Sequence, residues 1–289
     1  MDGAAWRGSP IRVRPNPGGF GAEITGVDLS RPLDAGVLAA VKRAWANHSV
    51  IWFPGQPLDH DQLETVTLQF GQFGDDPYLQ GLPDRPHIVE VRREATETSS
   101  PFGSAWHSDW SFQEQPPSAT LLHAKIVPPR GGDTLYADGY RAYETLSPLL
   151  QKMLEGMRGV HSAVRPYGPD GAYAREKEAR SMTILTSVEA ERTRSHPIVR
   201  THPISGRKAL FVNPVYTVGV ENMEPREAAA MLGFLFKHMT EDAFVYRHKW
   251  RPDMLTIWDN RCLMHNATGG YDGYQRVMHR TTVAGEIPV

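Results

Sequence analysis

Several features are scarce in this sequence, and each scarcity excludes a class of protein. Cys262 is the single cysteine among 289 residues, so an intrachain disulfide is impossible and a reducing cytoplasm is expected. No apolar run approaches the roughly 20 residues of a membrane-spanning helix, and residues 1–10 lack the apolar core of a signal peptide. The 31 basic and 33 acidic residues nearly balance and form no basic cluster. We therefore expect a cytoplasmic protein that binds neither nucleic acid nor a membrane.

Glycine and proline are plentiful by contrast, with 26 and 23 residues. This composition favours a turn-rich β or mixed fold over a helical bundle. The hydrophobic share of 40% is enough for a sizeable core. At about 150 residues per domain the length suggests two domains, although barrels and jelly rolls of this size often form one. Composition alone leaves both possibilities open.

Hydrophobic periodicity predicts helices over 34–47 and 59–70, and a third whose apolar stripe runs from Ala228 to Met239. Short apolar runs that end at turn residues predict strands. These runs are 11–13, 22–27, 50–53, 88–91, 119–127, 244–250, 254–258 and 275–283, with a hairpin over 197–202 and 208–213. Residues 166–195 are rich in charged and small polar groups, which predicts either a disordered loop or a mobile cover.

The most informative segment for chemistry is Trp106-His107-Ser108-Asp109-Trp110. In extended backbone, residues two apart point to the same side, so His107 and Asp109 are placed to share one metal ion. His265, where an apolar strand runs into a turn, is the best candidate for a third ligand. Two histidines and one carboxylate form the facial triad of non-haem Fe(II) oxygenases, which leaves three coordination positions open. With twelve histidines in the chain, the His-x-Asp pair by itself also fits a chance surface pair.

Two arginines, Arg276 and Arg280, follow His265 on the last apolar run. On a strand they share one face, and buried arginines need anionic partners because an unpaired buried charge is costly. The planar guanidinium suits carboxylates, with which it forms two parallel hydrogen bonds. The alternative is an outward strand face on which both arginines are solvated.

The order of these motifs along the chain resembles the taurine / 2,4-dichlorophenoxyacetate dioxygenase family of Fe(II)- and 2-oxoglutarate-dependent oxygenases. The resemblance covers nearly the whole chain. The matching motifs are residues 21–29, His107-x-Asp109, Gly131-Gly-Asp-Thr-Leu135, residues 196–203, Trp258-Asp-Asn260, His265, and Arg276 with Arg280. It implies a mainly β fold with packed helices, a double-stranded β-helix or jelly roll. It also implies one domain over 1–289, with 166–195 as a mobile cover or insert.

The resemblance assigns roles to individual residues. His107, Asp109 and His265 match the iron ligands, and Thr134 with Arg276 match the pair that holds 2-oxoglutarate. By the same resemblance, Arg280 matches the residue that faces an anionic group of the primary substrate. The implied chemistry uses O₂ and 2-oxoglutarate, releases succinate and CO₂, and hydroxylates the substrate in a homodimer or homotetramer.

The substrate is expected to be a small organic anion. Taurine-specific members have a histidine in the loop after the second helix and an asparagine four residues before the first ligand, where this chain has Asp76 and Gly103. Tyr216 and Trp110 are expected to form an aromatic wall. These differences favour an aryloxyalkanoate-like carboxylate with an apolar tail over taurine or an alkyl sulfonate or sulfate. A metal-free jelly-roll binding protein and a metal-dependent hydrolase or isomerase are the alternatives from other classes.

Overall fold

The computed structural model describes residues 11–289, so the expectation about a signal peptide in residues 1–10 lies outside the described part. The strands are β1 (Arg12–Pro15), β2 (Ala22–Thr25), β3 (Val50–Phe53), β4 (Val89–Arg93), β5 (Ala119–Ile126), β6 (Thr134–Asp138), β7 (Arg158–Ser162), β8 (Thr193–Pro197), β9 (Val199–Thr201), β10 (Lys208–Leu210), β11 (Thr217–Val220), β12 (Val245–His248), β13 (Leu255–Asp259), β14 (Leu263–Ala267) and β15 (Arg276–Val283). The helices are α1 (Ala35–His48), α2 (His60–Phe70), α3 (Gly139–Glu144), α4 (Pro148–Leu154), α5 (Val164–Tyr167), α6 (Ala172–Arg175) and α7 (Pro225–Met239), with 3-10 turns η1 (Val188–Glu191) and η2 (Asp242–Phe244).

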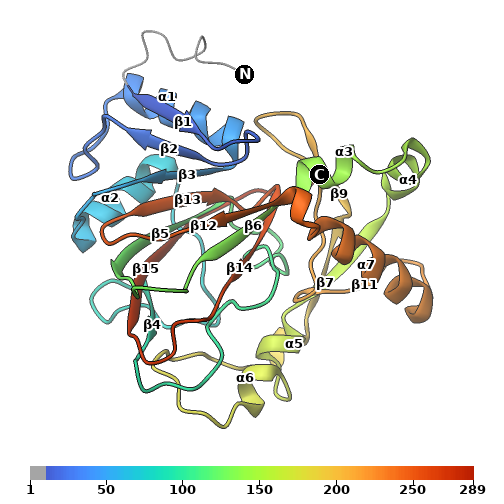
Figure 1. Cartoon of the computed structure of the whole chain (residues 1–289). Helices are drawn as coiled ribbons and strands as arrows, with labels where there is room; N and C mark the ends of the chain where they lie inside the picture. The colour runs from blue at the N-terminus through green and yellow to red at the C-terminus, as the bar shows by residue number, and fades with distance from the viewer. Residues whose placement is uncertain (1–10) are drawn as a thin grey trace.

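Two sheets form the body of the molecule (Figure 1). The larger has seven strands in the order β1-β2-β3-β13-β5-β15-β4, and the smaller has the order β12-β6-β14. Their inner faces share one hydrophobic cluster, to which Leu122 and Met278 contribute from the larger sheet and Tyr136 and Leu263 from the smaller. The fold is therefore mainly β, as predicted, with two sheets packed face to face.

The central strands of the larger sheet are buried on both faces. In β15 the alternating side chains send Met278 into the cluster between the sheets and Val283 to the opposite face. There α1 and α2 cover the sheet, with Val41 and Leu63 packed in the same cluster as Ile257. This arrangement points the even-numbered residues of β15 toward the space between the sheets.

The two N-terminal helices begin where the sequence predicts. The side chain of Asp34 accepts a hydrogen bond from the Val37 N–H and caps α1, and Asp59 caps α2 through a bond from Gln62. Residues 166–195 contain the end of α5, α6 and η1. Within residues 11–289, the structure has no helix that is long and apolar enough to cross a membrane.

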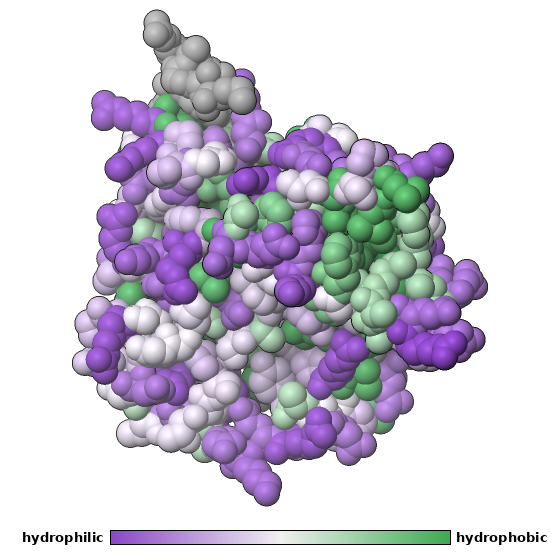
Figure 2. All heavy atoms as spheres, turned by 45° about the vertical axis from the view of Figure 1, so that its right-hand side comes forward, coloured by the Kyte–Doolittle hydropathy of each residue, from purple (hydrophilic) through white to green (hydrophobic). Residues whose placement is uncertain are grey.

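A second hydrophobic cluster joins α3, α4 and α7 to the two-stranded sheet β10-β9. Leu149 and Met153 of α4 and Phe234 of α7 remain more than half exposed. Figure 2 shows apolar side chains gathered on this side of a surface that is otherwise mostly hydrophilic. The homodimer or homotetramer expected from the sequence stays a prediction.

Candidate metal centre and cosubstrate site

The structure brings His107, Asp109 and His265 together between the two sheets. His107 and His265 exchange backbone hydrogen bonds of 3.0 and 2.7 Å, although 158 positions separate them in the sequence. Their ring centroids are 4.2 Å apart, and the candidate ligand atoms of all three residues lie within 4.8 Å of one another. The backbone pairing therefore places both imidazoles next to the carboxylate, which is the geometry that a shared metal ion requires.

Each ligand presents a suitable atom. The Nδ1–H of His107 donates to the carbonyl oxygen of Ala105 at 2.7 Å, which leaves Nε2 free, 3.5 Å from Oδ1 of Asp109. Nε2 of His265 lies 3.8 Å from the same oxygen, and burial lowers the pKa of His265 to about 3. Burial opposes ionisation of Asp109, but Arg280 and the two imidazoles hold its pKa well below the usual value. Two imidazoles and one carboxylate are the donor set that Fe(II) accepts.

A chain of hydrogen bonds fixes the second oxygen of Asp109. Thr120 Oγ1 donates to Asp109 Oδ2 at 2.5 Å, Asn260 Nδ2 donates to Thr120 at 2.9 Å, and Trp258 Nε1 donates to Asn260 at 2.9 Å. Because Oδ2 is held, Oδ1 faces the histidines. The sequence pointed to Trp258-Asp259-Asn260 only as a matching motif, and Thr120 carried no signal of its own.

Arg276 is a buried guanidinium without a carboxylate partner among residues 11–289. It is 6% exposed and forms no ion pair with an acidic residue of the described chain, 11–289, and its Nε has no hydrogen-bond partner. Burial lowers its pKa. Gly132 has φ +69°, and a Cβ there would lie 3.3 Å from Arg276 Cδ and Nε, so glycine leaves this side chain its space. The arrangement is a cationic site prepared for an anion.

Thr134 lines the same small cavity as Arg276 and the three metal-binding candidates. Its hydroxyl accepts a hydrogen bond from Trp250 Nε1 at 3.0 Å and can still donate its own hydrogen to another acceptor. The Arg276 guanidinium lies 5.9 Å from the Trp250 ring. Thr134 and Arg276 therefore offer a hydroxyl donor and a guanidinium beside the metal centre, which fits the carboxylate of a 2-oxo acid.

Arg280 differs from Arg276 because carboxylates surround it. Its Nη1 forms a short ion pair with Asp76, and its Nη2 lies 3.3 Å from Asp109 Oδ2. Burial alone would lower the pKa of Arg280, but Asp76 and Asp109 raise it. Asp76 also accepts hydrogen bonds from Trp110 Nε1 at 2.6 Å and from Thr282 at 3.4 Å. The sequence placed Asp76 near the substrate without indicating that it pairs with Arg280.

A larger cavity of about 370 Å³ opens onto His107. Part of its wall is formed by the aromatic residues Phe102, Tyr167, Tyr173 and Tyr216 together with Gly103. Gly103 has φ +74°, a backbone conformation that favours glycine, and a Cβ there would contact Cε1 of His107 at 3.4 Å. Arg180 at the rim is already paired with Glu176 at 2.5 Å.

The expectation that Trp110 forms part of this wall does not match its position. Trp110 is 1% exposed, does not line the cavity, and packs behind Tyr216 with ring centroids 6.4 Å apart. Its φ of 46° lies in a turn rather than in extended backbone. Trp110 instead covers Arg280, whose guanidinium lies 5.4 Å from its ring, and donates to Asp76.

Comparison with known proteins identifies the family. The family model described as "Taurine catabolism dioxygenase TauD, TfdA family" matches residues 12–282. An alpha-ketoglutarate-dependent sulfate ester dioxygenase of Pseudomonas putida is 31% identical over 283 residues, covering 96% of this chain and 91% of the relative. An alpha-ketoglutarate-dependent 2,4-dichlorophenoxyacetate dioxygenase of Cupriavidus pinatubonensis is 32% identical over 287 residues, covering 93% and 96%.

The solved structures agree with the sequence relatives. A taurine dioxygenase from Burkholderia xenovorans superposes with a TM-score of 0.80 at 31% identity, covering 96% of this chain and 91% of that one. The chain thus belongs to the TauD/TfdA family of dioxygenases. It is a non-haem Fe(II)-dependent enzyme that uses 2-oxoglutarate and O₂, as the resemblance predicted.

Proposed function

We propose that this enzyme hydroxylates a C–H bond in a small organic molecule whose apolar or aromatic tail lies in the cavity beside His107. The observation that carries the proposal is the opening of that cavity, with Tyr167, Tyr173 and Tyr216 in its wall, onto the metal centre. A site of this kind buries an apolar ligand and leaves orientation to a few polar groups. Residues 166–195 supply Tyr167 and Tyr173, and we propose that this segment covers the bound substrate.

The chain's own residues have distinct tasks in this proposal. His107, Asp109 and His265 hold Fe(II), and Thr120 keeps Asp109 oriented. Arg276 and Thr134 hold the distal carboxylate of 2-oxoglutarate. When bound, the iron and the cosubstrate supply the oxidising chemistry, with succinate and CO₂ as by-products. The two facing sheets, which we interpret as a double-stranded β-helix, keep these groups at fixed distances.

We propose that the head group of the substrate binds at Arg280, which lines the metal cavity. An aryloxyalkanoate-like carboxylate is the anionic candidate that the sequence favours. A sulfate ester or sulfonate is the second candidate, since a relative is named for sulfate esters. One observation favours an acceptor of a single hydrogen bond. Arg280 Nη1 is bound to Asp76, whereas the buried Nη2 lies 3.3 Å from Asp109 Oδ2 without forming a hydrogen bond among the described residues.

The test is substrate-stimulated succinate release in the presence of Fe(II), 2-oxoglutarate and O₂. The panel pairs compounds of equal charge with and without an apolar tail, such as phenoxyacetate with acetate and hexyl sulfate with methyl sulfate, and it also includes taurine. We expect the tailed member of each pair to stimulate succinate release more strongly. Tyr216→Ala is expected to reduce this advantage, and Leu149→Ala on the exposed face of α4 serves as the control. Higher catalytic efficiency with taurine than with every tailed compound would contradict the proposal.

A further inference from the structure

The head-group end of the proposed substrate site already contains an anion that belongs to the protein. The side chains of Asp76 and Arg280 are 9% and 5% exposed, and they form a direct ion pair. Two further donors, Trp110 and Thr282, bind the same carboxylate. The charge of Arg280 is therefore balanced before any substrate binds.

The backbone around Asp76 is anchored on both sides, so this carboxylate is held in place. The Gly74 N–H donates to the Thr282 carbonyl at 3.0 Å, and Gln113 Nε2 donates to the carbonyl of Asp75 at 3.2 Å. Leu79 pairs with Ile184 through an isolated β-bridge. An incoming anion would have to displace a carboxylate that is fixed from three directions.

The balance of charge in the site leads to the same conclusion. Fe(II) and Arg276 are offset by Asp109 and the two carboxylates of 2-oxoglutarate, and Arg280 is offset by Asp76. A substrate anion would add a buried charge without a partner, which is strongly unfavourable in a site of low dielectric. A neutral oxygen acceptor meets no such penalty and suits Nη2 of Arg280, which lies 3.3 Å from Asp109 Oδ2 but forms no hydrogen bond within residues 11–289.

We propose that Asp76 is a built-in counter-ion of Arg280 and determines specificity, so that the enzyme favours a substrate whose head group is an uncharged hydrogen-bond acceptor, such as an amide, ester or ketone. The proposal rests on the proposed function for the place where the substrate binds. It departs there from the anionic head group expected from the sequence. Asp76 acts through Arg280, and removal of its charge should convert the site into one that accepts anions.

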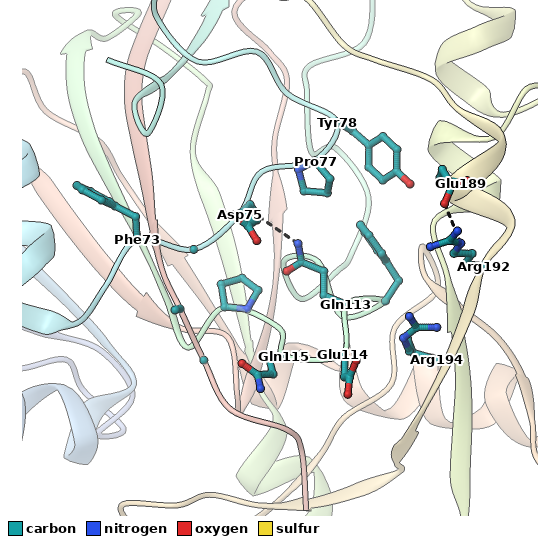
Figure 3. Close-up of a pocket in the computed structure, with 15 residues that line it drawn as sticks. Phe73, Asp75, Pro77, Tyr78, Gln113, Glu114, Gln115, Glu189, Arg192 and Arg194 are labelled. Carbon is teal, nitrogen blue, oxygen red and sulfur yellow. Dashed lines mark hydrogen bonds and ion pairs between the residues drawn. The ribbon is translucent and has the colours of Figure 1, made fainter. Parts of the chain in front are cut away.

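The neighbouring residue offers a matched control. Figure 3 shows Asp75 on the wall of a separate cavity of about 540 Å³, together with Gln113 and Arg194. The carboxylate of Asp76, in contrast, is bonded to Arg280. Asp75→Asn therefore changes the net charge as Asp76→Asn does, one position away, without touching the ion pair.

The first experiment measures inorganic sulfate binding by calorimetry, with the protein loaded anaerobically with Fe(II) and 2-oxoglutarate. Sulfate has no tail, so the result does not depend on the aromatic cavity. We expect Asp76→Asn to bind sulfate at least about tenfold more tightly than the wild type, and Asp75→Asn to match the wild type. Equal sulfate affinity in the wild type and Asp76→Asn, including no binding to either, would overturn the proposal.

The second experiment needs no variant, so it remains valid if Asp76→Asn folds poorly. Phenoxyacetamide and phenoxyacetate share ring and linker and differ in the charge of the head group. Under the same conditions the wild type should bind the amide more tightly, by about tenfold. Tighter binding of phenoxyacetate would overturn the proposal. A sulfate result as expected, with no binding of either phenoxy compound, would refute the tail in the proposed function and leave the role of Asp76 supported.

Discussion

Arg276 and Arg280 are the same residue type, four positions apart on the same face of β15, and both are almost fully buried. Their surroundings differ completely. Arg276 has glycine, tryptophan and a threonine hydroxyl around it and no ion pair within residues 11–289, whereas Arg280 contacts Asp76 and Asp109. Burial lowers the pKa of the first, and the neighbouring carboxylates raise the pKa of the second despite burial.

This difference shows how to decide whether a buried arginine binds a ligand. An unpaired guanidinium in the interior costs folding free energy, so its presence indicates an anion that binds later. A paired guanidinium already has its counter-ion and is poorly placed to receive another. By this reasoning Arg276 is the site for the carboxylate of 2-oxoglutarate, and Arg280 is part of an ion pair that shapes the substrate site.

The largest expected effect is the loss of cosubstrate binding when Arg276 is replaced. Arg276→Gln removes the charge that holds the carboxylate and should weaken 2-oxoglutarate binding by about 2–5 kcal/mol, which is well over tenfold. Calorimetric titration of the metal-loaded protein measures the change, and Arg280→Gln is the control on the same strand. A similar loss in both variants would show that the two arginines do not have separate roles.

A smaller effect is expected when Thr120 is replaced. This replacement tests metal binding separately from the ion pair between Arg280 and Asp76. Thr120→Val keeps the shape of the side chain but removes the donor to Asp109 Oδ2. Loss of such an outer hydrogen bond typically weakens metal affinity by about 10- to 100-fold. Fe(II) affinity should fall accordingly, measured by competition with a chelator, while sulfate binding stays as in the wild type. Unchanged Fe(II) affinity would mean that Arg280 alone orients Asp109.

The smallest effect concerns a histidine behind the Arg276 site. His248 packs against Trp250 with ring centroids 4.8 Å apart, and burial lowers its pKa to about 3. Because the folded pKa lies below the usual 6.5, His248 stays neutral when folded and takes up a proton on unfolding. Its contribution to stability is complete above pH 6.5 and falls as the pH drops.

Replacement of His248 tests this dependence. His248→Gln should flatten the decline of unfolding free energy between pH 6.5 and 5 by up to about 1.4 kcal/mol per pH unit. Urea unfolding at several pH values measures the slope. An unchanged slope would show that His248 is not protonated on unfolding in this range.

Sequence patterns were sufficient wherever the relevant partners are close along the chain. Asp34 and Asp59 cap their own helices, and the apolar alternation of β15 predicts that Arg276 and Arg280 share a face. His107 and Asp109 follow from a two-residue spacing, and their pairing with His265 is confirmed as a cluster. Local hydrogen bonding and strand alternation determine these features, so the sequence displays them directly.

The partners of Arg280 could not be predicted from the sequence, for the opposite reason. Asp76 lies 204 positions before Arg280 in a loop without periodicity, and only tertiary packing brings the two together. The hydrogen bonds from Thr120 and Asn260 to the metal site likewise join distant segments. The position of Trp110 likewise depends on tertiary contacts, because its ring donates to Asp76 and packs over Arg280. These features, which the sequence does not display, change the prediction about the head group of the substrate.

The central claim is that, within residues 11–289, Arg280 is ion-paired and Arg276 is not. It is tested most directly by unfolding the ligand-free protein. The free energy of unfolding is measured in urea for the wild type, Arg276→Gln, Arg280→Gln and the double variant Asp76→Asn/Arg280→Gln. Arg280→Gln should lose about 3–5 kcal/mol because Asp76 is left buried without its partner, and Asp76→Asn should restore part of the loss. Arg276→Gln should be as stable as the wild type or more stable. Equal losses in the two single variants, with no recovery in the double variant, would contradict the account.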